Sequence, residues 1–135
     1  MRKTIPNVLF IGSTSNGADA AELLAQFASV TRVMTVPTAL PSGETEAYDA
    51  VFCNWDCADG TWRDVLSRLK ELRLRIPLIV LSRCGCEKQW IEVLEAGAFD
   101  FLVPPYSSTQ LLAVLEHALA SSQPRMAHSL VAAAL

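Results

Sequence analysis

The feature that most constrains the fold of this chain is the regular alternation of short strand-like apolar runs with longer segments of helical periodicity. Runs of β-branched and other apolar residues predict strands at residues 8–11, 30–36, 50–53, 77–81 and 99–103. Apolar residues at helical spacing predict helices over residues 18–28, 61–72, 87–96 and 108–121, with a further short helix between 37 and 49. Because strands separated by helices run parallel, the alternation predicts a sheet that is buried on both faces.

Five alternating units specify a topology as well as a fold class. Right-handed crossovers between parallel strands favour an α/β, flavodoxin-like, doubly wound five-stranded parallel sheet in the order 2-1-3-4-5, with helices on both faces. A chain of 135 residues is long enough for one such domain, which we place at residues 1–122. Residues 123–135 form an Ala-rich C-terminal extension, for which an extra helix and a frayed tail both stay open.

Composition and charge argue against several classes of function. The net charge is −3 and there is no block of Lys and Arg, whereas nucleic-acid binding by this chain alone would depend on clustered cations. No apolar run reaches the roughly 20 residues of a membrane span, and the basic N-terminus is not followed by the apolar core of a signal peptide. We therefore expect no membrane association and a cytoplasmic location, where the four cysteines stay reduced.

Four segments of the chain resemble the receiver domains of response regulators. In chain order they are Tyr48–Asn54, Ala58–Gly60, Pro77–Ser82 and Ala96–Tyr106. The resemblance covers most of the chain and implies a signalling domain in which an Asp after the third strand accepts a phosphoryl group. It also implies a divalent metal ion, held by that Asp and by an acidic pair after the first strand, and a Lys after the fifth strand.

The residues at these positions lack the required chemistry. The phospho-acceptor position is Asn54, whose uncharged amide oxygen is a poor nucleophile. The acidic pair aligns with Gly12 and Ser13, which offer no carboxylate to Mg²⁺, and the Lys position is Pro104. The sequence therefore predicts a pseudo-receiver that has no metal site and needs no cofactor.

Three further positions keep the family pattern. Ser82 stands at the hydroxyl switch position, although a Ser at the start of a loop is equally an ordinary structural residue. Phe101 stands at the aromatic position whose rotation reports phosphorylation in the family, and core packing is the simpler interpretation of it. The resemblance also implies a cis peptide bond between Pro104 and Pro105.

Two aspartates near the third strand are weaker alternatives as phospho-acceptors. Neither Asp56 nor Asp59 stands at the end of the strand, and neither has an aligned Lys partner. Asp59 and Gly60 are better explained as a turn that caps the following helix, since such turns favour these residue types.

The loop from Gly12 to Gly17 supports a second interpretation of the chain. It resembles the phosphate loop of flavodoxins, which share the sheet order, because hydroxyl and backbone N–H groups at a helix N-terminus can hold a phosphate. A flavodoxin-like protein would bind FMN in this loop and stack Trp55 on the flavin. Gly17 is followed by Ala18 and Asp19, so the loop is not a P-loop.

The cysteines support a third interpretation. Cys57 follows the third predicted strand, and Cys84 and Cys86 follow the fourth, so their loops should be neighbours at one end of the sheet. Such a cluster would bind zinc or form a redox-sensitive disulfide. However, Cys53 is expected in the core, and a C-x-C spacing is less typical of structural zinc than C-x₂-C. Ordinary structural cysteines are therefore the plainer interpretation.

The leading interpretation is a non-enzymatic, atypical receiver domain of two-component signal transduction that acts by phosphorylation-independent protein–protein interaction or dimerisation. In the receiver family, partners and dimer mates bind the face of the fourth helix, fifth strand and fifth helix, or the face of the first and fifth helices. Here these faces correspond to residues 87–96, 99–103 and 108–121, or to residues 18–28 and 108–121. We therefore expect a protein partner or a homodimer on one of these faces.

Overall fold

A computed structural model describes residues 5–12, 20–33, 48–57, 60–71, 76–82 and 85–121 of the chain. Several predictions lie outside the described residues. They concern Ser13 and the rest of the loop up to Gly17, the short helix between 37 and 49, Asp59, Cys84 and the extension 123–135. For Asp56 and Cys57 the backbone is described and the side chains are not. None of the described helices is long and apolar enough to cross a membrane.

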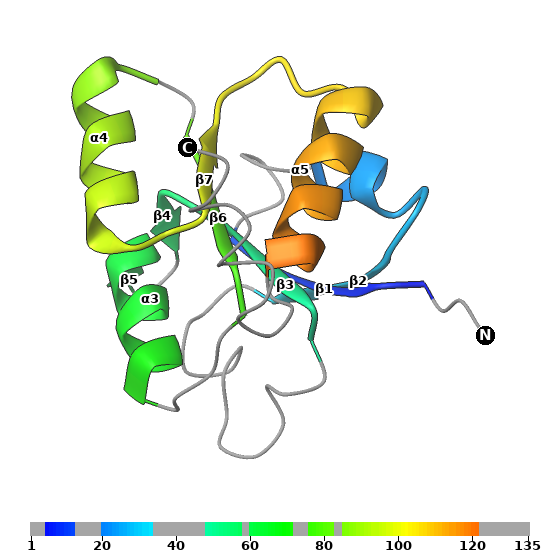
Figure 1. The fold of residues 1–135 in the computed structure, drawn as a ribbon, viewed down its shortest axis with the longest axis horizontal. Helices are drawn as coiled ribbons and strands as arrows, with labels where there is room; N and C mark the ends of the chain where they lie inside the picture. Colours follow the sequence, from blue (N-terminus) through cyan, green and yellow to red (C-terminus); the bar gives the residue numbers. More distant parts are fainter. Residues whose placement is uncertain are drawn as a thin grey trace, which may run out of the picture.

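The core of the fold is a five-stranded parallel sheet (Figure 1). Its strands are β1 (Asn7–Ile11), β2 (Ser29–Val33), β3 (Ala50–Asn54), β6 (Leu78–Leu81) and β7 (Asp100–Leu102). They are arranged in the order β2-β1-β3-β6-β7, which confirms the predicted order 2-1-3-4-5 and the doubly wound fold class.

Within the described residues, three helices of ten or more residues pack on the sheet. They are α3 (Trp62–Glu71), α4 (Glu87–Ala96) and α5 (Ser108–Ser121). Helix α4 is followed by Gly97, whose left-handed conformation (φ 113°) lets its N–H bond the carbonyl of Leu94. Helix α5 is capped by the preceding Ser107, whose hydroxyl accepts the Gln110 N–H at 3.1 Å.

The first helix ends earlier than its apolar pattern predicts. Residues 20–24 are helical and residues 25–27 form a turn, whereas the pattern extends to residue 28. The Gln26 and Phe27 N–H groups bond carbonyls only three residues back, at Leu23 and Leu24, which is the tighter spacing of a 3₁₀ turn. Ala28 is buried nevertheless, because the turn still packs on the sheet.

A two-stranded antiparallel ribbon precedes α3 and was not predicted. It consists of β4 (Asp56–Cys57) and β5 (Gly60–Thr61). The cap of α3 lies one residue later than the predicted Asp59–Gly60 turn: Thr61 Oγ1 accepts the Arg63 N–H, and the Asp64 carboxylate accepts the Thr61 N–H at 2.9 Å. This reciprocal pair of bonds is a capping box. The predicted cap at Asp59–Gly60 stays a prediction, because Asp59 lies outside the described residues, in which Thr61 and Asp64 supply the cap.

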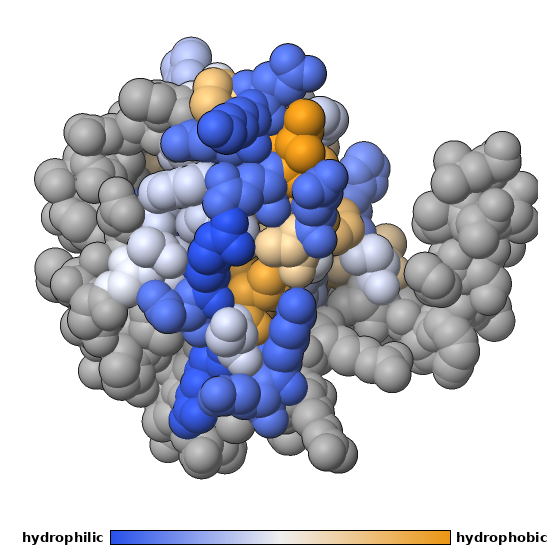
Figure 2. Space-filling view, turned by 90° about the vertical axis from the view of Figure 1, so that its left-hand side faces the viewer, coloured by the Kyte–Doolittle hydropathy of each residue, from blue (hydrophilic) through white to orange (hydrophobic). Residues whose placement is uncertain are grey.

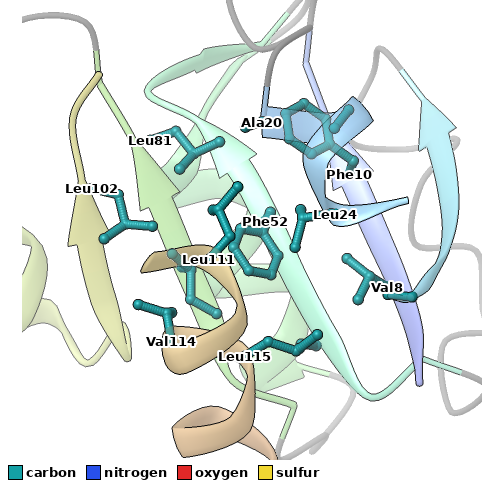
Figure 3. Packing of buried hydrophobic residues seen from close by; sticks show 14 of the residues in the cluster. Val8, Phe10, Ala20, Leu24, Phe52, Leu81, Leu102, Leu111, Val114 and Leu115 are labelled. Carbon is teal, nitrogen blue, oxygen red and sulfur yellow. The ribbon is translucent and has the colours of Figure 1, made fainter. Parts of the chain in front are cut away.

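The sheet separates two apolar cores, because alternate side chains of each strand point to opposite faces. In β1, Val8 and Phe10 face the first core, while Leu9 and Ile11 face the second. Figure 3 shows the first core, where α5 and the helical residues 20–24 cover Phe10, Phe52 and their neighbours. Helices α3 and α4 cover the second core. All the residues of β3 are buried as a consequence.

Two adjacent leucines of α5 give a matched test of this arrangement. Leu111 is fully buried in the first core, whereas Leu112 is 38% exposed. Leu111→Ala should lower the free energy of unfolding by about 2–5 kcal/mol through lost burial and the cavity left behind, and Leu112→Ala by less than about 1 kcal/mol. Urea denaturation followed by circular dichroism measures both, and equal losses would contradict the packing of α5.

Candidate functional site

The candidate site lies at the carboxyl ends of β1, β3 and β6, where ligands bind in sheets of this type. Backbone bonds extend the sheet one residue past the strands: Gly12 N–H donates to Val33 at 2.9 Å, Trp55 N–H to Leu81 at 2.7 Å and Ser82 N–H to Leu102 at 3.0 Å. The predicted positions Gly12, Asn54 and Ser82 are therefore brought to one edge of the sheet on neighbouring strands.

Gly12 and Asn54 are packed directly against each other. A Cβ atom on residue 12 would lie 2.7 Å from Cγ and 2.9 Å from Cβ of Asn54, which no real side chain tolerates. Gly12 also has a φ of 143°, a conformation that residues with a side chain rarely adopt. Asn54 itself is only 4% exposed. The family resemblance implies an acidic side chain at position 12, and in this conformation the Asn54 amide fills the space that it would need.

The other charged groups of a receiver site are also absent from the described residues. No group of three or more His, Cys, Asp or Glu side chains within those residues is placed to hold a metal ion. Pro104 lies two residues beyond β7, is exposed and carries no charge. The Pro104–Pro105 peptide bond is cis. The described part of this edge therefore presents an amide, a glycine and a proline where the family resemblance implies carboxylates and a cation.

Ser82 connects the end of β6 to α4. Its side chain is almost fully buried, at 6% exposure, and its hydroxyl donates a hydrogen bond to the side-chain carbonyl of Gln89 at 3.0 Å. Gln89 lies in the first turn of α4, so the bond ties the beginning of this helix to the strand end. The residue predicted as a switch hydroxyl is thus engaged by a side chain of the same domain.

Phe101 belongs to a cluster of three aromatic side chains. It is 8% exposed and packs edge-on against Trp55, with ring centroids 6.1 Å apart. Trp55 in turn packs against Trp62, with centroids 5.5 Å apart. Phe101 therefore packs in the core, which was the simpler interpretation of this residue. Trp55, the residue suggested to stack on a flavin, instead packs against two rings of the same chain. Sequence reasoning missed the cluster, because its rings come from β7, from the residue after β3 and from α3.

A second connection to α4 extends from this cluster. The Arg63 guanidinium lies 4.7 Å from the centroid of the Trp62 ring, in cation–π contact, and forms an ion pair with Glu92 of α4. Both side chains are substantially exposed, so the ion pair contributes little stability by itself. It joins α4 to α3, as the Ser82–Gln89 bond joins α4 to the end of β6.

The described cysteines do not form a cluster. Cys53 is fully buried in the second core, as predicted, and donates a hydrogen bond to the Asn54 carbonyl. Cys86 is exposed just before α4 and is a free thiol. The convergence of Cys57 and Cys84 with Cys86 stays a prediction, since the Cys57 side chain and Cys84 lie outside the described residues.

Comparison with known proteins agrees with this geometry. The signal receiver domain of a LuxO repressor protein from Vibrio parahaemolyticus superposes with a TM-score of 0.76, over 89% of this chain and 94% of that one, at 20% identity. A response regulator receiver domain from Clostridium thermocellum also gives a TM-score of 0.76, over 87% of this chain and 97% of the other, at 18% identity. The chain has the fold of a response-regulator receiver domain.

Sequence similarity finds transcriptional regulatory proteins. The transcriptional regulatory protein ZraR of Salmonella typhimurium is 29% identical over 85 residues, which are 63% of this chain and 19% of that protein. The chain spans about a fifth of the length of the first curated relatives that it matches. No family model matches the chain. The receiver fold nevertheless accounts for the placement of Gly12, Asn54, Ser82 and Phe101 at or beside one edge of the sheet.

Gly12 and Gly97 give a matched test of the packing at this edge. Both have a positive φ, but a Cβ atom on Gly97 would meet no atom closer than 3.8 Å, whereas one on Gly12 would overlap Asn54. Gly97→Ala should cost about 1–2 kcal/mol of stability from backbone conformation alone. Gly12→Ala should cost more than Gly97→Ala, as measured by urea denaturation. A smaller loss for Gly12→Ala would show that Asn54 moves aside freely.

Proposed function

We propose that this chain is an atypical receiver domain that acts in two-component signal transduction through protein contacts, without being phosphorylated and without catalysing a reaction. The observation that carries the proposal is the packing of Gly12 against the buried Asn54, at the edge where receiver chemistry would take place. An amide nitrogen and oxygen there offer neither a carboxylate nucleophile nor a metal ligand of full charge.

Three separate positions support this loss of chemistry. Phosphoryl transfer to a receiver depends on the acceptor, on a metal held by carboxylates and on a cation that neutralises the developing charge. The corresponding residues here are Asn54, Gly12 with Ser13, and Pro104. Restoring the family residue at one of these positions would still leave the other two roles unfilled. We accordingly propose that the domain uses no metal and no cofactor, and that it acts in the cytoplasm.

The attachment of α4 supports a role that needs no switching. The resemblance implies that, in phosphorylated receivers, the side chains at the positions of Ser82 and Phe101 change their conformation. In this chain Ser82 bonds Gln89, and Phe101 is buried against Trp55. Both side chains have intramolecular partners without a phosphoryl group. The domain therefore presents α4 in one arrangement, which a partner can recognise at any time.

Two surfaces are available for such a partner. The face formed by α4, β7 and α5 carries Trp90, which is 46% exposed on α4. On the side of α5 near the first helix, Leu112 is 38% exposed and Ser108 bonds Gln26. Exposed large apolar side chains are typical of contact surfaces, and Trp is enriched among residues that dominate binding energy. We propose that a protein partner or a second copy binds one of these faces.

Incubation with acetyl phosphate and Mg²⁺ followed by intact-protein mass spectrometry tests the proposal. We expect no phosphoryl adduct on the wild-type chain, because no acceptor carboxylate is present at the strand end. A phosphoryl adduct on the wild-type chain would contradict the proposal. A receiver domain with a complete acidic site, treated in parallel, shows that the reagent is active.

The variant Asn54→Asp tests whether the acceptor position alone prevents phosphorylation. It restores the acceptor but not the acidic pair or the Lys, so we expect it to stay unmodified under the same conditions. An adduct on Asn54→Asp alone would show that Gly12 and Pro104 are not additional barriers to phosphorylation.

A further inference from the structure

Three exposed residues form a line along the side of α4 that faces away from the sheet. Lys88, Ile91 and Glu95 are all exposed, and their spacing of three and four residues places them within about 60° around the helix. Val93, on the opposite side of α4, is fully buried. Figure 2 views the molecule from the side of α3 and α4, where hydrophilic residues surround a smaller number of hydrophobic ones. We call Lys88, Ile91 and Glu95 the α4 outer stripe.

The α4 outer stripe is apolar at its centre and charged at its ends. Ile91 is 41% exposed; a single exposed apolar side chain is ordinary by itself, and it is the opposite charges on either side of it that distinguish this stripe. Lys88 and Glu95 form no ion pair among the described residues, in contrast to Glu92, which is paired with Arg63. The same stripe lines a shallow groove beside α3, which also includes Arg63 and Ala96.

The stripe is complementary to itself. Lys88 lies three residues before Ile91 and Glu95 lies four residues after it. If two copies of α4 packed antiparallel about a two-fold axis near Ile91, Lys88 of each copy would face Glu95 of the other. At a rise of about 1.5 Å per residue, the mismatch of one residue is well within the reach of a Lys side chain. The two Ile91 side chains would then meet at the axis.

We propose that the α4 outer stripe binds the same stripe of a second copy of this chain, with the two helices antiparallel. The inference rests on the proposed function, because it specifies how a domain that acts by contact would self-associate. A two-fold axis requires the same patch on both copies, and opposite charges at the two ends of one patch meet this requirement. The proposed interface lies on the outer side of α4. For a second copy it therefore replaces the two faces named above, which stay available to a different protein partner.

The size of the contact sets the expected strength. Two helices of ten residues each bury less surface than the roughly 1,200–2,000 Å² of stable complexes. The dimer should therefore form and dissociate with concentration rather than persist on dilution. Sedimentation velocity over a wide range of protein concentrations should show a reversible monomer–dimer equilibrium. A chain that stays monomeric throughout would overturn the inference.

Charge reversal gives a test that is specific to the antiparallel arrangement. Lys88→Glu would place Glu against Glu95 at both ends of the dimer, and Glu95→Lys would place Lys against Lys88. Each single variant should raise the dimer dissociation constant roughly tenfold or more, since two attractive pairs become repulsive. An equimolar mixture of the two variants should dimerise again, because every pair in the mixed dimer then joins Glu to Lys.

Two controls separate this effect from simpler causes. Arg32→Glu on β2 and Glu71→Lys at the end of α3 change the net charge of the chain by the same amounts, at exposed positions outside the α4 outer stripe and outside the two faces proposed for a partner. Their mixture should dimerise no more strongly than the wild type. Circular dichroism should show that each α4 variant keeps its helix. Failure of the Lys88→Glu and Glu95→Lys mixture to recover association would overturn the proposed pairing, even if the wild type dimerises.

The outcome is independent of the phosphorylation experiment. A monomeric wild-type chain that takes up no phosphoryl group would overturn the self-association and leave the proposed function in place. A phosphoryl adduct would overturn the proposed function whatever the oligomeric state.

Discussion

The burial of the central strands on both faces is the constraint on which the rest of this structure depends. Every residue of β3 is buried, and β1 and β6 send alternate side chains into two separate cores. A sheet of this kind needs a helical layer on each side, and with right-handed crossovers the order β2-β1-β3-β6-β7 provides one. That order brings the ends of β1, β3 and β6 side by side, and the polar residues of this edge follow from it.

The same burial makes the substitutions at the edge consistent with one another. A carboxylate at the position of Asn54, which is 4% exposed, would be costly unless a metal ion or a Lys compensated its charge. A neutral amide removes this cost. A Lys at the position of Pro104 would balance such a carboxylate directly, whereas acidic side chains at Gly12 and Ser13 would do so only by holding a metal ion. With a neutral residue 54, neither the cation nor the metal is needed, so the loss of each separate role is consistent with the loss of the others.

The sequence predicted most of the framework because its strands and helices have strong periodicity, and the resemblance to receivers identified the edge residues. Three features were beyond it for physical reasons. The ribbon of β4 and β5 has only two residues in each strand, too few for a pattern to show. The aromatic contacts of Trp55 join elements far apart in the chain. The contact of Gly12 with Asn54 depends on a backbone conformation that glycine can adopt, but a glycine in the sequence does not by itself predict that conformation.

The two side-chain links that hold α4 have a consequence for how such a domain would be regulated. Gln89 joins the helix to β6 and Glu92 joins it to α3, so the recognition surface is already assembled before any partner arrives. A partner that binds a pre-assembled surface has only side chains to order, and its apparent affinity is not reduced by a fraction of molecules in an inactive state. Occupancy would then follow the amounts of the two proteins in the cell, so that synthesis and degradation, rather than modification, would set the strength of the output.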